Sequence, residues 1–165
     1  MDLMSDNLTR HHAYAPAGYH TITPYFAVPA GAGAKALDFY ERAFGARVLS
    51  RMDGPDGSVL HAELLFGDSV VQLSDEIPSM GIAAPDGSTV SGSFGMYVDD
   101  PDAVYATAVA AGARGVAEPQ DVFSGDRMAT VMCPYGHRWN ILKRVEDVPE
   151  EEIERRAREW MAENG

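Results

Sequence analysis

The stretch LDFYERAFGAR, residues 37–47, decides how this chain of 165 residues is interpreted. Its apolar residues Leu37, Tyr40 and Phe44 recur at the spacing of one helix face, which predicts an amphipathic helix. The glycine that follows is a typical residue to end such a helix. The last four residues, FGAR, align with AGAR at residues 111–114. The chain therefore repeats the junction between a helix and the strand that comes after it.

The residues around the first of these helices predict a β-α-β-β-β order. Each expected strand is short, is rich in β-branched or aromatic residues, and is separated from the next by Gly, Pro or Asp. Pro24 lies inside the first strand and removes a backbone donor, so this strand is expected at a sheet edge or with a bulge. The expected strands are Thr21–Val28, Val48–Met52, Leu60–Phe66 and Ser69–Ser74, with the helix at Ala34–Phe44.

The second half of the chain predicts the same order. A helix with acidic residues in its first turn, at 99–102, ends at Gly112 and follows a strand at Phe94–Val98. Three further strands are expected at Arg114–Ala117, Arg127–Cys133 and Arg138–Lys143. A repeat of about 70 residues with matched order is the strongest sign of organisation in the chain.

The prediction is an α+β fold of two tandem βαβββ modules with an additional C-terminal helix. Module one covers residues 21–75, a linker covers 76–92, and module two covers 93–146. Residues 1–20 lack periodicity and are interpreted as a flexible arm. The linker is longer than an ordinary connection, which leaves open a role as a lid.

The C-terminal helix is predicted over residues 147–165, with Asp147 as its N-cap. Ile153, Ala157, Trp160 and Met161 form one apolar stripe on it. A stripe of this kind requires a partner, which is either the rest of the same chain or a second subunit.

Composition and charge exclude several functions. The formal net charge of −12 repels phosphate backbones and anionic lipids, so we expect no nucleic-acid or membrane partner. The single cysteine, Cys133, forms neither an internal disulfide nor a zinc site of several cysteines. No apolar run reaches the length of a membrane span, and no secretory signal is evident. We expect a soluble, cytoplasmic protein.

The alternation of side chains along each strand predicts two faces on each sheet. The face expected to pack under the helices carries Phe26, Val28, Leu60, Ala62, Leu64, Phe66, Val71, Leu73, Phe94, Met96, Val98, Ala129, Val131, Cys133, Trp139 and Ile141. The opposite face mixes aromatic, methionine and hydrogen-bonding groups, and suits an organic ligand with a flat apolar body. Its residues are Thr23, Tyr25, His61, Glu63, Gln72, Ser74, Ser93, Tyr97, Met128, Thr130, Met132 and Asn140, with Arg127 reaching either solvent or an anionic group at the cavity mouth.

The tandem βαβββ order resembles that of the vicinal oxygen chelate superfamily, which includes glyoxalase I, extradiol dioxygenases and bleomycin-binding proteins. Local motifs are similar to its PhnB-like branch: TPY at 23–25, GPDG at 54–57, HAEL at 61–64, GDS at 67–69, GDR at 125–127 and PYGH at 134–137. The resemblance implies curled sheets that together enclose a cavity, and a homodimer. It specifies the fold better than any reaction, because one scaffold serves many functions.

The resemblance also implies where a metal would bind. Metal-dependent members place one ligand on the first strand and one on the last strand of each module. Those positions fall here at Thr23, Gln72, Ser93 and Asn140. All four are neutral, weak donors, whereas a divalent metal prefers imidazole and carboxylate. We therefore expect no cofactor, and keep a divalent metal with relocated ligands as the alternative.

His61 and Glu63 are the candidate catalytic residues. They lie two apart on one strand and so face the same side, where a carboxylate raises the basicity of a neighbouring imidazole. They are interpreted as an acid–base pair, as relocated metal ligands, or as polar groups of the cavity wall. Tyr25 and Tyr97 are interpreted as related by the repeat, either flanking a ligand or packing. Cys133 is expected in the core.

Two function classes remain open. The first is a metal-free protein that binds a small organic, possibly aromatic, molecule. The second is a lyase, isomerase or cyclase that uses His61 and Glu63 as acid–base groups or as metal ligands. The identity of the ligand does not follow from the sequence.

Overall fold

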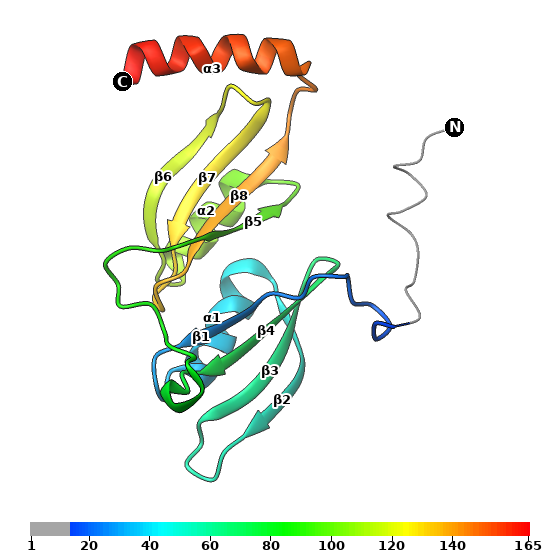
Figure 1. Ribbon diagram of the computed structural model, residues 1–165, viewed down its shortest axis with the longest axis vertical. Coiled ribbons are helices and arrows are strands. Elements are labelled where there is room, and N and C mark those ends of the chain that lie inside the picture. Colours follow the sequence, from blue (N-terminus) through cyan, green and yellow to red (C-terminus); the bar gives the residue numbers. More distant parts are fainter. Residues whose placement is uncertain (1–13) are drawn as a thin grey trace. The chain divides into compact units, whose positions relative to one another are not determined.

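A computed structural model describes residues 14–165, so the predicted arm at residues 1–20 lies mostly outside the described residues. The chain divides into two compact units, Met1–Glu41 with Gly45–Ala84, and Arg42–Phe44 with Pro85–Gly165. Each unit holds one mixed four-stranded sheet (Figure 1). The element order confirms the predicted α+β fold of two βαβββ modules followed by a C-terminal helix.

The sheet of unit 1 has the strand order β1-β4-β3-β2. Strands β1 and β4 pair in parallel, and the other neighbours pair antiparallel. Helix α1 connects β1 to β2 and ends where Gly45 adopts a left-handed conformation, with φ of 65°. The elements are β1 (Tyr25–Val28), α1 (Gly33–Phe44), β2 (Arg47–Asp53), β3 (Val59–Phe66), β4 (Ser69–Asp75) and the 3₁₀ helix η1 (Pro78–Met80).

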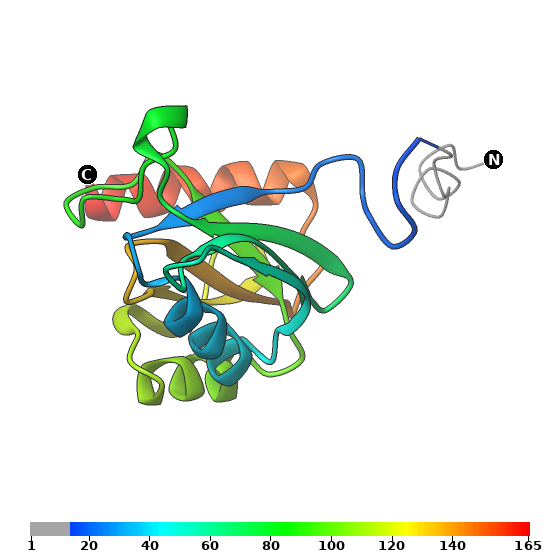
Figure 2. The same ribbon diagram turned by 90° about the horizontal axis from the view of Figure 1, so that it is seen from below.

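Helix α1 lies against one face of this sheet, as Figure 2 shows. Tyr40 of the helix is fully buried between two aromatic rings of the sheet. Its ring centroid lies 5.8 Å from that of Phe26 and 5.6 Å from that of Phe66, both edge-on. Such edge-to-face pairs stabilise a core beyond the apolar area that they bury. The opposite face of the sheet is therefore left for polar side chains.

Unit 2 repeats the arrangement with the strand order β5-β8-β7-β6, in which β5 and β8 are parallel. Helix α2 begins at Pro101, and the carboxylate of Asp100 caps it by accepting a hydrogen bond from the N–H of Ala103 at 3.0 Å. Of the core residues predicted for unit 2, those on β7 and β8 and Cys133 are buried, whereas Phe94, Met96 and Val98 are half-buried. The elements are β5 (Ser93–Tyr97), α2 (Pro101–Ala110), β6 (Arg114–Asp121), β7 (Asp126–Met132), β8 (Arg138–Arg144) and α3 (Glu150–Asn164).

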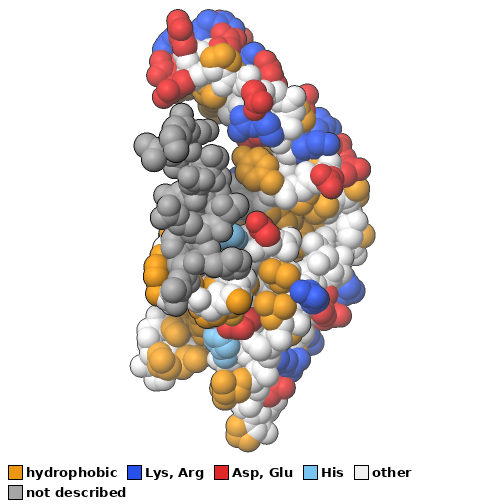
Figure 3. Space-filling model, turned by 90° about the vertical axis from the view of Figure 1, so that its right-hand side faces the viewer, with side chains coloured by type: hydrophobic (Ala, Val, Ile, Leu, Met, Phe, Trp, Pro, Cys, Tyr) orange, Lys and Arg blue, Asp and Glu red, His pale blue; other side chains and the backbone are white. Residues whose placement is uncertain are grey.

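Helix α3 is amphipathic, with no fully buried residue. Arg156 connects it to the segment that follows β8 by donating to both carboxylate oxygens of Glu146, each at 3.0 Å. The ring of Trp160 lies 6.2 Å from that of Phe123 in the turn between β6 and β7. Acidic and basic side chains are interspersed over the surface of α3, at the top of Figure 3. No helix among residues 14–165 is long and apolar enough to cross a membrane.

Three expectations about the elements were wrong in detail. The first strand is Tyr25–Val28 rather than Thr21–Val28, because Pro24 has no N–H to give to the ladder. Strand β6 runs to Asp121, beyond the predicted end at Ala117. Asp147 is not the N-cap of α3, since the helix begins at Glu150, preceded by Pro149.

Candidate functional site

A row of four side chains crosses the sheet of unit 1 on the face opposite α1. The pairing register places Tyr25 of β1 beside Gln72 of β4, Gln72 beside Glu63 of β3, and Glu63 beside Ser50 of β2. Directly paired residues share one face of a sheet. The row thus brings together three residues predicted from sequence, Tyr25, Glu63 and Gln72, and one that was not, Ser50.

Glu63 is the acceptor on which this row converges. The hydroxyl of Ser50 donates to Oε2 at 3.0 Å, and the amide of Gln72 donates to Oε1 at 3.4 Å. The hydrogen bonds from Tyr19, then Ser50, Gln72 and His61, hold the pKa of Glu63 below its ordinary value, outweighing the effect of partial burial. Glu63 is therefore an ionised acceptor and a poor proton donor at neutral pH.

His61 lies beside this carboxylate and next to an aromatic ring. Its Nε2 lies 3.7 Å from Oε1 of Glu63, and both side chains are partly exposed. The ring of Tyr25 is stacked near it, with centroids 6.1 Å apart and planes inclined by 29°. The Tyr25 hydroxyl donates to Oγ of Ser74 at 2.6 Å, which fixes the tyrosine ring. The arrangement offers a flat aromatic surface next to an anionic acceptor.

Ser74 is less available than the sequence suggested. Its side chain is fully buried, and its hydroxyl donates to the carbonyl of Asp75 at 2.7 Å. The same oxygen accepts the hydrogen bond from the Tyr25 hydroxyl. Ser74 therefore holds the tyrosine side chain in place and is not itself exposed to a ligand. Thr23 is half-buried just before β1 and lies outside the strand.

The corresponding row in unit 2 carries smaller side chains. The register places Gly95 beside Asn140, Asn140 beside Thr130, and Thr130 beside Ala117. Asn140 therefore matches Gln72, but Gly95 stands where unit 1 has Tyr25. Tyr97 pairs with Leu142 two residues further along, so the expectation that Tyr25 and Tyr97 are related by the repeat was wrong.

The predicted polar residues of unit 2 bind one another. The Thr130 hydroxyl, which is buried, donates to Oδ1 of Asn140 at 3.0 Å, and Nδ2 of Asn140 donates to Oγ of Ser93 at 3.3 Å. The phenol of Tyr97 donates to the buried carboxylate of Asp126 at 3.3 Å. Met128 and Met132 are half-buried on the same face of β7. The Asp126 carboxylate also accepts from Nε of Arg144 at 2.7 Å, so the acidic group of this face is already paired with a cation.

Arg127 does not belong with these residues. Its guanidinium donates two hydrogen bonds to Asp102 of α2 and one to Asp121 at the end of β6. Helix α2 covers the other face of the sheet, so Arg127 points away from the polar face. The sequence predicted that Arg127 reaches either solvent or an anionic group at the cavity mouth, whereas the anionic groups that it binds belong to α2 and to the end of β6.

The residues at the implied metal positions do not fit a divalent cation. Thr23, Gln72, Ser93 and Asn140 are neutral, and the last three already take part in hydrogen bonds between side chains. Divalent metals select imidazole or carboxylate donors. Within the part of the chain that the structure describes, no group of three or more His, Cys, Asp or Glu side chains is arranged to hold a metal ion.

Cys133 and His137 form a second pair of reactive groups, but both are buried. The backbone N–H of His137 donates to Sγ at 3.3 Å, and the sulfur lies 3.8 Å from Nδ1. Burial lowers the pKa of His137 to about 4, so the imidazole is neutral at physiological pH. Cys133 lies in the core, as predicted.

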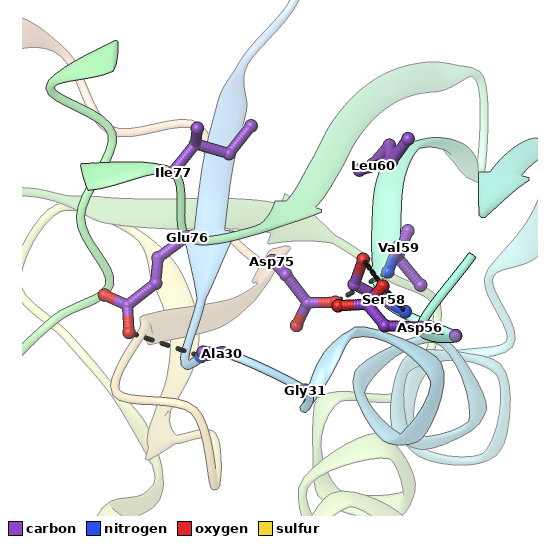
Figure 4. A pocket seen from close by; sticks show the side chains of 10 residues that line it. Ala30, Gly31, Asp56, Ser58, Val59, Leu60, Asp75, Glu76 and Ile77 are labelled. Carbon is purple, nitrogen blue, oxygen red and sulfur yellow. Dashed lines mark hydrogen bonds between the residues drawn. The ribbon is translucent and has the colours of Figure 1, made fainter. Parts of the chain in front are cut away.

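A cavity of about 300 Å³ lies at the start of α1 and β3 (Figure 4). Backbone N–H groups around the cavity already donate hydrogen bonds to its three carboxylates. Asp75, which is buried, accepts from the N–H groups of Gly33 and Val59 at 2.9 and 2.6 Å. Glu76 accepts from Ala30 at 3.3 Å, and Asp56 accepts from Ser58. The hydrogen bonds of Asp75 thus connect the end of β4 to the start of α1 and to the start of β3. The polar groups of this cavity therefore have a structural role.

Two residues of the site escaped prediction. Ser50 could have been found, because it lies on the strand paired with β3 at the position opposite Glu63. Tyr19 could not, since it precedes the first strand, where no periodicity predicts its effect on the pKa of Glu63.

Comparison with known proteins identifies relatives. A family model described as the glyoxalase/bleomycin resistance protein/dioxygenase superfamily matches residues 22–141. An uncharacterized protein of Mycobacterium tuberculosis is 37% identical over 125 residues, which cover 73% of this chain and 74% of that protein.

Solved structures share the fold. A gene product of Arabidopsis thaliana is 29% identical with a TM-score of 0.61, and the match covers 74% of this chain and 97% of that one. TioX from Micromonospora sp. ML1 is 24% identical with a TM-score of 0.58, and the match covers 79% of this chain and all of that one.

Proposed function

Because this chain belongs to the glyoxalase/bleomycin resistance protein/dioxygenase superfamily, we propose that it is a metal-free protein that binds a small organic molecule. The observation that carries the proposal is the polar face of unit 1, where the stacked rings of Tyr25 and His61 adjoin the ionised Glu63. A flat apolar body fits against the rings, and a polar hydrogen fits the carboxylate. We further propose the PhnB-like branch, on the motifs of the sequence, and a second copy of the chain as partner.

The donor set supports the metal-free part of the proposal. The four positions that hold a metal in metal-dependent relatives carry hydroxyl and amide groups here. Glu63 accepts hydrogen bonds from Ser50 and Gln72, so lone pairs on both of its oxygens are directed to hydrogen-bond donors.

Native mass spectrometry of untagged protein tests this proposal. We expect a dimer mass, no bound metal after exposure to zinc, nickel or manganese, and an organic adduct that is released unchanged on activation. The variant His61→Ala removes one ring of the stack and should lose the adduct, whereas His20→Ala alters an exposed histidine of the same unit and should retain it. A stoichiometric divalent metal would overturn the proposal.

A second candidate function is acid–base catalysis at the same site. The observation that favours it is the distance of 3.7 Å between Nε2 of His61 and Oε1 of Glu63. A carboxylate at this position orients the imidazole toward a bound ligand. His61 would then transfer the proton, with Glu63 as its positioning residue.

The variant His61→Phe separates the two functions. It keeps a flat ring beside Tyr25 and removes the group that transfers a proton. If both proteins retain the bound ligand and neither changes it chemically, the result supports binding alone. Conversion of the ligand by the native protein, lost in the variant while binding persists, supports catalysis.

A further inference from the structure

The carboxylate of Glu63 is held in the sheet by neutral groups. The Ser50 hydroxyl and the Gln72 amide donate to it without compensating its negative charge. In the part of the chain that the structure describes, no lysine or arginine forms an ion pair with it, and Arg51 of the adjacent strand is paired within that strand. The group beside Glu63 that can become positive is His61, whose Nε2 lies 3.7 Å from Oε1.

Two carboxylates of unit 2 differ from Glu63, because each is compensated by an arginine. Asp126, on the polar face of unit 2, is paired with Nε of Arg144 at 2.7 Å. Glu146 accepts two hydrogen bonds from the guanidinium of Arg156, each at 3.0 Å. Glu63 thus keeps a charge that a ligand can neutralise. Because its side chain is partly buried, water and salt screen that charge less than they screen one on the open surface.

Three side chains beside Glu63 form a flat and polarisable surface on the same face of the sheet. Tyr25 and His61 are stacked, with ring centroids 6.1 Å apart. Met52 of β2 pairs with His61 of β3, so it lies on this face, and it is 57% exposed. The faces of aromatic rings attract cations, and a thioether makes favourable contacts with a ring. This surface therefore suits a planar ring that carries a positive charge.

We propose that the ligand of this face is a planar aromatic cation, such as an arylamidine or a benzylic amine, whose charge pairs with Glu63 and whose ring lies on the adjoining aromatic surface. The inference rests on the proposed function and adds the chemical class of the ligand. The net charge of −12 favours the approach of a cation and disfavours that of an anion. An organic cation requires one opposite charge and a ring surface, whereas a divalent metal requires several imidazole or carboxylate donors.

Benzamidine, benzamide and benzoate test the inference, because they share one planar shape and carry a positive, a zero and a negative charge. The side-chain amide NMR signal of Gln72, which donates to Glu63, reports binding at this face. We expect the native protein to bind benzamidine about fivefold more tightly than benzamide, and benzoate more weakly than either. The preference for benzamidine should shrink at about 0.5 M salt.

The variant Glu63→Gln removes the charge and keeps the size of the side chain, so benzamidine and benzamide should bind to it equally. The control Glu41→Gln makes the same change at an exposed residue of α1, the helix that covers the opposite face, and should keep the native preference. Thermal unfolding establishes that both variants fold. If Glu63→Gln does not fold, the salt dependence of the native protein decides whether charge carries the preference.

The possible outcomes distinguish this inference from the proposed function. Equal affinity of the native protein for benzamidine and benzamide, or tighter binding of benzoate, overturns the cationic class but leaves organic-ligand binding intact. A preference for benzamidine that persists in Glu63→Gln, or that salt does not reduce, overturns the role of Glu63. Absence of any shift at Gln72 with all three probes, together with no organic adduct in native mass spectra, overturns the proposed function and the inference with it.

Discussion

The guanidinium of Arg127 donates two hydrogen bonds to the carboxylate of Asp102, from Nε to Oδ2 at 2.6 Å and from Nη2 to Oδ1 at 2.7 Å. Asp102 lies in the first turn of α2, and Arg127 lies near the start of β7. A bidentate pair of this kind fixes orientation as well as distance. It therefore joins the helix to the sheet that it covers.

We predict that Arg127→Met lowers the melting temperature but leaves binding at the polar face of unit 1 unchanged. The pair is partly exposed, so salt screens it, and the loss should shrink at about 1 M salt. The control Arg51→Met removes an ion pair with Asp53 that spans only two residues of one strand. Equal losses in the two variants would show that the link between α2 and β7 stabilises the protein no more than a local ion pair does.

The example of Arg127 shows what alternation along a strand can and cannot predict. It placed Ala129, Val131, Trp139 and Ile141 correctly in the core, because the sheet has one face covered by a helix. Strand alternation predicted no partner for Arg127, because the partner lies on a helix. The position of that helix above the strand depends on the tertiary fold and not on the pattern within the strand.

Alternation also fails where a strand pairs irregularly. Leu60 was expected in the core but is 45% exposed, whereas Val59 is fully buried. The pairing of β2 with β3 shifts between Met52 and Asp53, so one residue is added on one strand and the faces exchange there. Such a bulge is not visible in a single sequence.

The two leucines of β3 provide a stability test of this correction. Leu64 is fully buried, so Leu64→Ala should reduce the free energy of unfolding by about 3 kcal/mol. Leu60→Ala should reduce it by less than about 1 kcal/mol, since nearly half of that side chain is already in water. Urea unfolding of both variants measures the difference, and similar losses would contradict the observed register.

Strand alternation also predicted part of the candidate site. His61, Glu63 and Gln72 were found because strand parity places them on one face. Tyr19, which lowers the pKa of Glu63, was missed because it precedes the first strand, where strand alternation predicts no neighbour.

Buried His137 predicts a pH dependence of stability. Its pKa of about 4 lies below the ordinary value of 6.5, because burial disfavours the charged imidazole. Between these two values the unfolded chain takes up a proton that the folded chain does not, so stability falls as the pH decreases. From about pH 7.5 to about pH 5.5 the contribution is about 1 kcal/mol.

Urea unfolding at both pH values compares the native protein with His137→Asn. The variant should lose less stability on acidification, by about that amount, whatever its stability at neutral pH. His20→Asn, which changes an exposed histidine, should retain the native pH dependence. An equal pH dependence in His137→Asn and the native protein would show that His137 titrates normally in the folded state.

Gly125 is a position where the chain tolerates no side chain. Its φ of 92° is left-handed, and its carbonyl accepts hydrogen bonds from the N–H groups of Val145 and Glu146, each at 3.0 Å. A Cβ there would collide with the carbonyl oxygen of Glu146.

Gly57 provides the control, because it has a similar φ of 81° but open space surrounds its Cβ position. Gly57→Ala should therefore cost about 1 kcal/mol of unfolding free energy from backbone strain alone. Gly125→Ala should cost clearly more, because the carbonyl that it displaces belongs to the segment leading to α3. Urea unfolding of the two variants isolates the collision, and equal losses would show that this turn can relax around a methyl group.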